Sequence, residues 1–274
     1  MRARGIDFAV FSSPPVGRTP PLLCINGGML YGHSMLWPAL SPLAEKRQVI
    51  LYDQRGRGKS TQPQVPADAT IDDDAADVGA LRRALGIRQW DVLGHSWGGG
   101  IAMLATPNDA GGVRRLALVD PVWTTSAWMA PLRQAVLARL QGEQREAVAH
   151  ISEDSLGIPD PVLHSAYSRA VYPAWFADSE MAIHFTPPDA TSVTGAAVLA
   201  RLRRDGYDWR DRLRAVSTPA LVLHGERDPL PLGLADPAHE SYLGSAQVVV
   251  VPSSGHMPFW DAPRRFFELL ESFL

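Results

Sequence analysis

Hydrophobic residues fall into short, nearly continuous runs through the first 121 residues of the chain, and polar turn residues close most of them. Apolar runs of this length that end on Gly, Pro, Asn or Asp are typical of strands buried on both faces of a sheet. The predicted strands are residues 6–11, 22–25, 48–52, 91–94 and 113–119. The first of them is expected to be an edge strand.

One segment between these runs has the spacing of a helix. Residues 70–85 begin with acidic side chains, which suit the positive end of a helix dipole. Val78, Leu81 and Leu85 then follow at helical spacing, and Gly86 ends the pattern. Strands that alternate with helices predict a mostly parallel sheet covered by helices on both faces.

The alternation stops at about residue 122 and returns at about residue 218. The stretch between them is predicted to be wholly helical, over residues 130–140, 144–151, 161–177 and 191–216. The elements predicted after it are strands 219–224 and 247–251, a helix near 235–242 and a closing helix 263–274. The sequence therefore predicts one sheet-based domain, residues 1–121 and 218–274, with residues 122–217 as a helical insertion.

Composition and charge are those of a folded protein without a nucleic-acid partner. Hydrophobic residues make up 46% of the chain, which is enough for a sizeable core. The 26 basic and 29 acidic residues give a formal charge of −3 and form no basic stripe. The lone cysteine, Cys24, cannot form an internal disulfide and fits a reducing compartment. With no signal-like core and no membrane-spanning run, the chain is expected to be cytoplasmic, without a membrane partner.

The strand that ends at Gly94 leads into Gly94-His95-Ser96-Trp97-Gly98 and then into a helical run. This is the strand–turn–helix context of the G-x-S-x-G nucleophile elbow. A serine on so sharp a turn exposes its hydroxyl above the sheet edge, and flanking glycines let the neighbouring chain pass closely. The following helix directs its dipole toward an oxyanion beside Ser96. Ser96 is the candidate nucleophile; a glycine-rich turn with a solvent-facing serine is the alternative.

A serine hydroxyl needs a base, and the base needs a group that orients it. Two loops after late predicted strands supply these groups: Asp228 follows strand 219–224, and His256 follows strand 247–251. Parallel α/β sheets gather their active sites at this carboxyl edge. The chain order Ser96, Asp228, His256 is the order of nucleophile, acid and base in one large class of hydrolases.

Other polar residues compete with these candidates. Glu226 and Asp120 are alternative acids, although Asp120 is expected to cap the entry to the insertion, and Asp228 itself could be a turn residue. Asp53 and Arg55 are expected to hold loops together near the site by hydrogen bonds and ion pairs. The histidines expected to pack and form hydrogen bonds are His33, His95 and His224. Metal-ligand spacing is not found, so neither a metal nor a cofactor is predicted.

In combination, these motifs resemble the α/β-hydrolase family over nearly the full length of the chain. The resemblance implies that Ser96 is the nucleophile, Asp228 the triad acid and His256 the base. It also implies that the insertion is a helical cap that shapes the substrate pocket. Residues 53–60, Asp-Gln-Arg-Gly-Arg-Gly-Lys-Ser, and the elbow with its tryptophan are similar to those of proline iminopeptidase-like serine hydrolases.

Within this resemblance, the oxyanion hole is expected at the backbone amides of Gly28 and Trp97. Losing one such donor typically costs ~10²–10³ in rate. Residues 26–30 read Asn-Gly-Gly-Met-Leu, where the peptidase-like relatives usually carry His-Gly-Gly-Pro-Gly. Backbone donors survive this change, so the prediction of hydrolase chemistry stands while that of peptidase specificity is weakened.

Large aromatic residues are candidates to line the pocket, because a cap over an apolar substrate needs an apolar lining. The candidates are Trp37, Trp123, Trp128, Tyr172, Trp175 and Phe176. An aminopeptidase would also need carboxylates to hold the ammonium group of its substrate. The glutamates available in the cap lie in charged or polar stretches, where solvated faces are expected: Glu143, Glu146, Glu153 and Glu180.

The sequence therefore predicts a cofactor-free serine hydrolase that cleaves a small, fairly apolar carboxylic ester or lactone through an acyl-enzyme. A proline iminopeptidase-like aminopeptidase or amidase is the second hypothesis. A ligand-binding protein without turnover is the third, because a fold alone does not establish activity. All three hypotheses have a small molecule as the partner.

Overall fold

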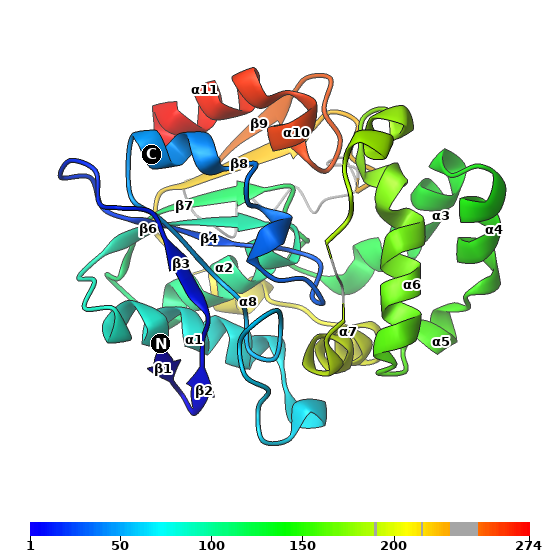
Figure 1. The fold of residues 1–274 in the computed structure, drawn as a ribbon, viewed down its shortest axis with the longest axis horizontal. Helices are drawn as coiled ribbons and strands as arrows, with labels where there is room; N and C mark the ends of the chain where they lie inside the picture. Colours follow the sequence, from blue (N-terminus) through cyan, green and yellow to red (C-terminus); the bar gives the residue numbers. More distant parts are fainter. Residues whose placement is uncertain (189–190, 215, 231–245) are drawn as a thin grey trace.

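The computed structural model describes residues 1–188, 191–214, 216–230 and 246–274. Its main sheet has seven strands in the order β3-β5-β4-β6-β7-β8-β9 (Figure 1). These strands are β3 (Val10–Ser12), β4 (Leu22–Ile25), β5 (Val49–Tyr52), β6 (Trp90–His95), β7 (Val113–Val119), β8 (Ala220–Gly225) and β9 (Gln247–Val251). Strand β3 pairs antiparallel with β5 at one edge, and the other pairs are parallel. The predicted mostly parallel sheet is confirmed.

Alternate residues of the central strands pack into two separate hydrophobic cores. Leu23 and Ile25 of β4 lie in one core, whereas Leu22 and Cys24 lie in the other. The same alternation continues along β5, β6 and β7. Because successive side chains of a strand point to opposite faces, both faces of this sheet are buried. This burial explains why the strands read as continuous apolar runs.

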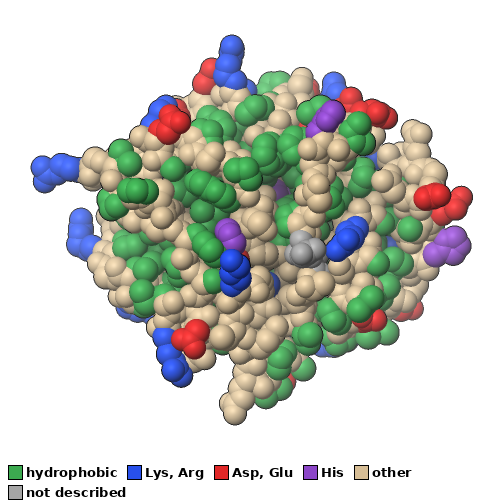
Figure 2. All heavy atoms as spheres, in the orientation of Figure 1, with side chains coloured by type: hydrophobic (Ala, Val, Ile, Leu, Met, Phe, Trp, Pro, Cys, Tyr) green, Lys and Arg blue, Asp and Glu red, His purple; other side chains and the backbone are tan. Residues whose placement is uncertain are grey.

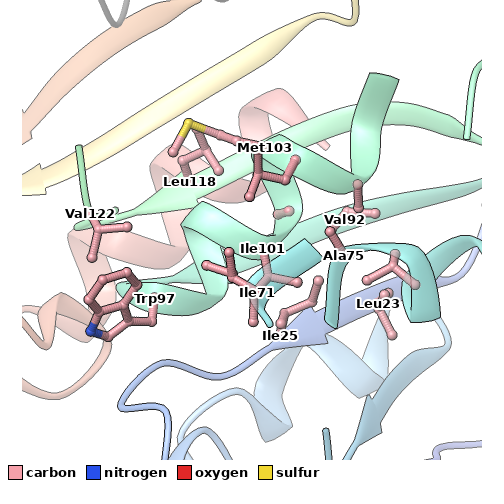
Figure 3. Packing of buried hydrophobic residues seen from close by; sticks show 14 of the residues in the cluster. Leu23, Ile25, Ile71, Ala75, Val92, Trp97, Ile101, Met103, Leu118 and Val122 are labelled. Atoms are coloured by element: carbon pink, nitrogen blue, oxygen red, sulfur yellow. The ribbon is translucent and has the colours of Figure 1, made fainter. Parts of the chain in front are cut away.

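Helices cover both faces of the sheet (Figure 1). Helices α1 (Ile71–Ala84) and α2 (Trp97–Asn108) pack against each other on one face, and α10 (Pro258–Asp261) and α11 (Pro263–Phe273) cover the other. Figure 3 shows Ile71 and Ala75 of α1 and Ile101 of α2 against Leu23 and Val92 of the strands. The elbow therefore rests on a helix pair that is itself buried against the sheet.

The first long helix begins where the sequence predicted. Thr70 Oγ1 accepts a hydrogen bond from the Asp73 amide, and the Asp73 carboxylate accepts one from the Thr70 amide. This reciprocal capping box satisfies two amide groups at the start of α1. The predicted helix 70–85 is confirmed, within one residue at each end.

The insertion leaves the sheet between β7 and β8 and lies beside the carboxyl ends of the strands (Figure 1). Its α-helices are α3 (Met129–Arg139), α4 (Gly142–His150), α5 (Glu153–Leu156), α6 (Pro161–Val171), α7 (Val193–Asp205) and α8 (Arg210–Leu213). Its 3-10 helices are η4 (Ser126–Trp128), η5 (Tyr172–Trp175) and η6 (Ser179–His184). Short 3-10 helices also occur before α1, as η1 (His33–Met35), η2 (Ser41–Glu45) and η3 (Pro66–Asp68). These α-helices and the 3-10 helices η4, η5 and η6 lie within residues 122–217.

Several predicted boundaries differ from the structure. The predicted strand 6–11 is divided, because β2 (Ile6–Asp7) forms a separate hairpin with β1 (Arg2–Ala3) before β3 joins the main sheet. The predicted helix 161–177 changes to a 3-10 helix after Val171. The helix predicted over residues 191–216 is interrupted at Gly206, whose φ of 64° ends α7. The helix predicted near residues 235–242 lies outside the described residues.

Two surface properties bear on possible partners. Within the described residues, no helix combines the length and the hydrophobicity that crossing a bilayer requires. On the face shown in Figure 2, basic and acidic side chains are scattered among each other rather than gathered by sign. That distribution agrees with the nearly balanced charge of the sequence.

Candidate active site

Ser96 stands on a strained turn between β6 and α2. Its φ of 54° and ψ of −122° are unfavourable for a residue with a side chain. A Cβ at Gly94 would overlap the Gly98 carbonyl, and a Cβ at Gly98 would overlap the Ile25 carbonyl. The turn therefore has the strain and the close packing that the sequence predicted for a nucleophile elbow.

His256 and Asp228 meet at the ends of neighbouring strands β9 and β8. His256 Nδ1 lies 2.8 Å from Asp228 Oδ2, and the Leu230 amide donates to Asp228 Oδ1 at 2.9 Å. Burial would raise the pKa of Asp228, but the His256 ring and its hydrogen bond hold that pKa below its ordinary value. An ionised Asp228 orients the Nδ1–H of His256, which leaves Nε2 as the ring nitrogen available to act as a base.

Backbone contacts fix the loop that carries His256. Its amide donates to the Trp175 carbonyl at 2.7 Å, and its carbonyl lies 2.8 Å from His95 Nε2. Ser96 and His256 line the same cavity, although no hydrogen bond joins their side chains among the described residues. Catalytic hydrogen bonds are often long before a substrate binds, so substrate would have to close this contact.

The first loop brings Gly28 to the same cavity as Trp97, the first residue of α2. Gly28 has a φ of 69°, in the region that glycine tolerates. Gly27 packs directly on the nucleophile candidate, because a Cβ there would lie 2.5 Å from Ser96 Cβ. Within the described part of the chain, neither the Gly28 nor the Trp97 amide donates to a protein acceptor. Two such amides beside a serine are suited to bind an oxyanion.

Buried polar side chains from residues 53–60 hold this first loop. Gln54 Nε2 donates to the Asn26 carbonyl at 2.8 Å, and Arg57 Nε donates to the Met29 carbonyl at 2.8 Å. Arg57 in turn forms a bidentate ion pair with Asp74 of α1, at 2.8 and 3.0 Å. The loop is therefore attached to α1 through a fully buried guanidinium group.

The predicted structural roles of Asp53 and Arg55 are confirmed. The two Asp53 oxygens accept the amides of His33 and Lys59, each at 2.7 Å. Arg55 pairs with Asp77 of α1 through two hydrogen bonds of 2.7 and 2.6 Å. These residues connect loops around the site rather than line its cavity.

The alternative acids have other partners. The sequence predicted that Asp120 caps the entry to the insertion, and the structure corrects this prediction. Asp120 Oδ1 instead accepts the Gly225 amide at 2.7 Å, in the turn after β8. Glu226 accepts the Ser253 amide at 2.9 Å, at an exposed position. His224 Nδ1 lies 3.5 Å from Asp120 Oδ1. Asp228 is the carboxylate that contacts His256.

Asp120, His224 and Asp228 place potential metal-ligand atoms within 4.8 Å of one another, a cluster that sequence spacing did not indicate. Asp228 already accepts hydrogen bonds from His256 and Leu230, and Asp120 accepts one from Gly225. These contacts fit a buried hydrogen-bonded cluster better than a metal site, because a metal ion would compete with His256 for Asp228.

A cavity of about 110 Å³ lies between the insertion and the sheet edge, with Ser96 and His256 on its wall. Three of the six aromatic candidates line it, namely Trp128, Tyr172 and Trp175. The Trp175 ring also packs on His256, with ring centroids 4.5 Å apart. The insertion therefore covers the candidate site with apolar side chains.

The other three aromatic candidates lie elsewhere, so the expectation that they face the pocket is corrected. Trp37 is 37% exposed after η1. Trp123 is buried in the core shared with α2, and its carbonyl accepts the Tyr207 hydroxyl at 3.1 Å. Phe176 is buried against Phe185, with ring centroids 5.4 Å apart.

Most of the residues that complete the cavity wall are not distinguished by any motif in the sequence. The apolar ones are Leu30, Tyr31, Met35, Val122, Met129, Leu132, Val136, Tyr167, Val171, Leu199, Leu230 and Met257. Helical spacing on α3, as in Leu132 and Val136, was the signal that could have found some of them. Arg133 and Arg203 also line the cavity, whereas its described lining contains no Asp or Glu.

Comparison with known proteins places this geometry in a family. A family model described as the alpha/beta hydrolase fold matches residues 20–263. The proline iminopeptidase of Lactobacillus delbrueckii subsp. bulgaricus is 31% identical, over 93% of this chain and 89% of its own.

Solved structures that match this chain have the same fold. The proline iminopeptidase of Mycobacterium smegmatis has 25% identity and a TM-score of 0.69, over 99% of this chain and 95% of its own. An esterase from Exiguobacterium antarcticum shares the fold at 24% identity, with a TM-score of 0.70 over 99% of this chain and 97% of its own.

Proposed function

The chain belongs to the alpha/beta hydrolase family and is a hydrolase, and we propose that it cleaves a small, fairly apolar carboxylic ester or lactone through a serine acyl-enzyme. The observation that carries this proposal is the small apolar cavity, whose wall includes Ser96 and His256 but no described carboxylate. A sheltered apolar cavity beside a nucleophile and a base suits a neutral acyl substrate.

In the proposed reaction, His256 Nε2 removes the proton of Ser96 Oγ as that oxygen attacks the substrate carbonyl. The amides of Gly28 and Trp97 donate to the resulting oxyanion. Asp228 keeps the proton on Nδ1 and stabilises the imidazolium. Collapse of the intermediate expels the alkoxide, which takes the proton from His256, and water then hydrolyses the acyl-enzyme by the reverse sequence.

The volume of the cavity favours a substrate with a short acyl group. At about 110 Å³ the cavity is smaller than the ~150 Å³ engineered cavity that holds benzene. Leu132, Val136 and Leu199 on α3 and α7 contribute to its apolar wall. We therefore expect the rate with p-nitrophenyl esters to fall as the acyl chain grows beyond a few carbons.

A proline iminopeptidase-like activity is the second candidate, favoured by the proline iminopeptidases among the relatives. Such an enzyme must bind the ammonium group of an N-terminal proline. The charged side chains on the described cavity wall are Arg133 and Arg203, and no described carboxylate lines that wall to pair with an ammonium group. Glu143, Glu146 and Glu180 of the insertion are exposed and do not line the cavity.

The test compares purified protein on p-nitrophenyl acetate, butyrate and octanoate with its activity on proline p-nitroanilide. We expect turnover of the short esters, no cleavage of the anilide, and a loss of at least ~10³-fold in Ser96→Ala. Efficient anilide cleavage that depends on Ser96 would favour the iminopeptidase candidate. A single stoichiometric burst without turnover would favour a ligand-binding protein that becomes acylated.

A further inference from the structure

A second buried carboxyl group lies behind the proposed triad acid. Asp120 follows β7 and is fully buried, with a φ of 42° that is unfavourable for most residues with a side chain. A carboxylate oxygen of Asp120, a ring nitrogen of His224 and a carboxylate oxygen of Asp228 lie within 4.8 Å of one another. The Gly225 amide donates to Asp120 Oδ1, which ties Asp120 to the turn that carries Asp228.

The environment of Asp120 favours the protonated form of its carboxyl group. No N–H or O–H donor of the described residues reaches Asp120 Oδ2, and a buried ionised oxygen without a donor is costly. Burial and the nearby Asp228 raise the pKa of Asp120 well above its ordinary value. Burial also lowers the pKa of His224, so this ring is neutral and does not balance a second negative charge. A protonated Asp120 becomes a donor.

We propose that Asp120 is a positioning residue of the triad: its carboxyl group donates a hydrogen bond to Asp228 and holds that carboxylate against His256. The proposal rests on the proposed function, because that function assigns Asp228 and His256 their triad roles. Three donors then converge on Asp228, from Asp120, His256 and the Leu230 amide. This arrangement fixes the carboxylate and moderates its attraction for the proton on the imidazolium.

Two further charged groups lie near the pair, and both have other partners. The Asp261 carboxylate of α10 accepts the Gly255 amide at 2.7 Å. The Arg139 guanidinium of α3 donates to the Ala174 carbonyl at 2.9 Å. Substitution of Asp120 leaves both groups in place, so changes in pH dependence report on the contact between Asp120 and Asp228.

The test measures the rate at which a fluorophosphonate probe labels Ser96 as a function of pH. Ser96 Oγ forms a bond to phosphorus, fluoride leaves, and His256 takes the serine proton. Asp120→Asn keeps a donor for Asp228 and an acceptor for Gly225, whereas the similarly sized Asp120→Leu keeps neither. Asp109→Asn is the matched control, because Asp109 is a buried aspartate that pairs with Arg82, outside the candidate site.

We expect Asp120→Asn to retain at least about a third of the labelling rate, with the acid limb of the pH profile unmoved. Asp120→Leu should label about tenfold more slowly at neutral pH. Its acid limb should move about one unit upward, because Asp228 without that donor holds the imidazolium proton more strongly. Asp109→Asn should lower the melting temperature without moving the limb, and excess EDTA should change nothing in the wild type.

Other results would overturn the proposal. If Asp120 is ionised, both variants remove a negative charge and the limb moves downward, a shift that Asp120→Asn alone would reveal if the leucine variant does not fold. If Asp120 only supports the fold, melting temperatures fall while the limb stays in place in both variants. A rate that depends on a chelator would place a cation between the carboxyl groups. Failure of the wild type to react with the probe would instead contradict the proposed function.

Discussion

At the residue scale, burial separates two neighbouring histidines into different roles. The rings of His95 and His256 lie 4.9 Å apart, and burial lowers the pKa of His95 to about 3. At pH 5, about two units above that pKa, roughly 1% of His95 is protonated. His95 is therefore a neutral partner for the His256 carbonyl rather than a second base.

The pH dependence of the activity should therefore show a single protonation at low pH. A plot of log kcat/KM against pH for a short ester is expected to reach a limiting slope of about one on its acid side. The rate falls toward low pH because the base must be neutral to accept the serine proton. His95→Gln keeps a donor for the His256 carbonyl, so its slope should be the same. A slope of two in the wild type would show that His95 titrates as well.

The close packing of Gly27 against Ser96 leads to a second prediction at the residue scale. A methyl group at Gly27 would lie 2.5 Å from Ser96 Cβ and 2.7 Å from the His95 carbonyl, so the first loop must shift. Gly27→Ala is expected to lower kcat by ~10²-fold or more, since the neighbouring Gly28 amide would leave its position. Gly157→Ala, where the nearest atom is the Asp154 carbonyl at 3.2 Å, is the control and should keep its activity. Full activity in Gly27→Ala would argue against an oxyanion role for Gly28.

At the element scale, the sequence predicted well what local pattern determines. Both faces of strands such as β4 and β7 are buried, so each reads as an apolar run, and the elbow glycines are required by the turn itself. The packing of the helices in the insertion is harder to predict, because helical periodicity indicates which residues share a face but not which element that face packs against. The prediction that Trp123 and Phe176 face the pocket is therefore wrong, because both lie in the hydrophobic cores. Asp120 contacts a turn more than a hundred residues later, a contact that no local pattern reveals.

The capping box of α1 offers a prediction about one element alone. Thr70→Ala removes the hydroxyl that accepts the Asp73 amide, which should cost about 1 kcal/mol of unfolding free energy and lower the melting temperature by about 2–4 °C. Thr70→Ser keeps the acceptor and should melt close to the wild type. Ester turnover should be unchanged in both, because Thr70 does not line the cavity. Equal melting of the alanine variant and the wild type would mean that the cap adds nothing to stability.

At the scale of the whole molecule, the insertion and the sheet are built into the same cores. Trp128 and Val198 of the insertion pack in the core on one face of the sheet, and Tyr172 and Phe176 pack in the core on the other. The Ser192 hydroxyl adds a polar link by donating to the Gly56 carbonyl at 2.6 Å. A smaller cluster on α3, α4, α6 and η5 is internal to the insertion. Apolar side chains of the insertion are thus buried together with side chains of the sheet and its helices.

Shared cores predict that the chain unfolds in one step. Calorimetry should show one transition with an enthalpy of roughly 190 kcal/mol, from roughly 0.7 kcal/mol per residue, and the van't Hoff value should agree with it. A fluorophosphonate adduct on Ser96 should shift that whole transition rather than part of it. Residues 122–217 expressed alone should not fold, because their apolar faces would lose the sheet as a partner. Two separate transitions, or a folded isolated segment, would show that the insertion is an independent domain whose docking, rather than whose folding, completes the cavity.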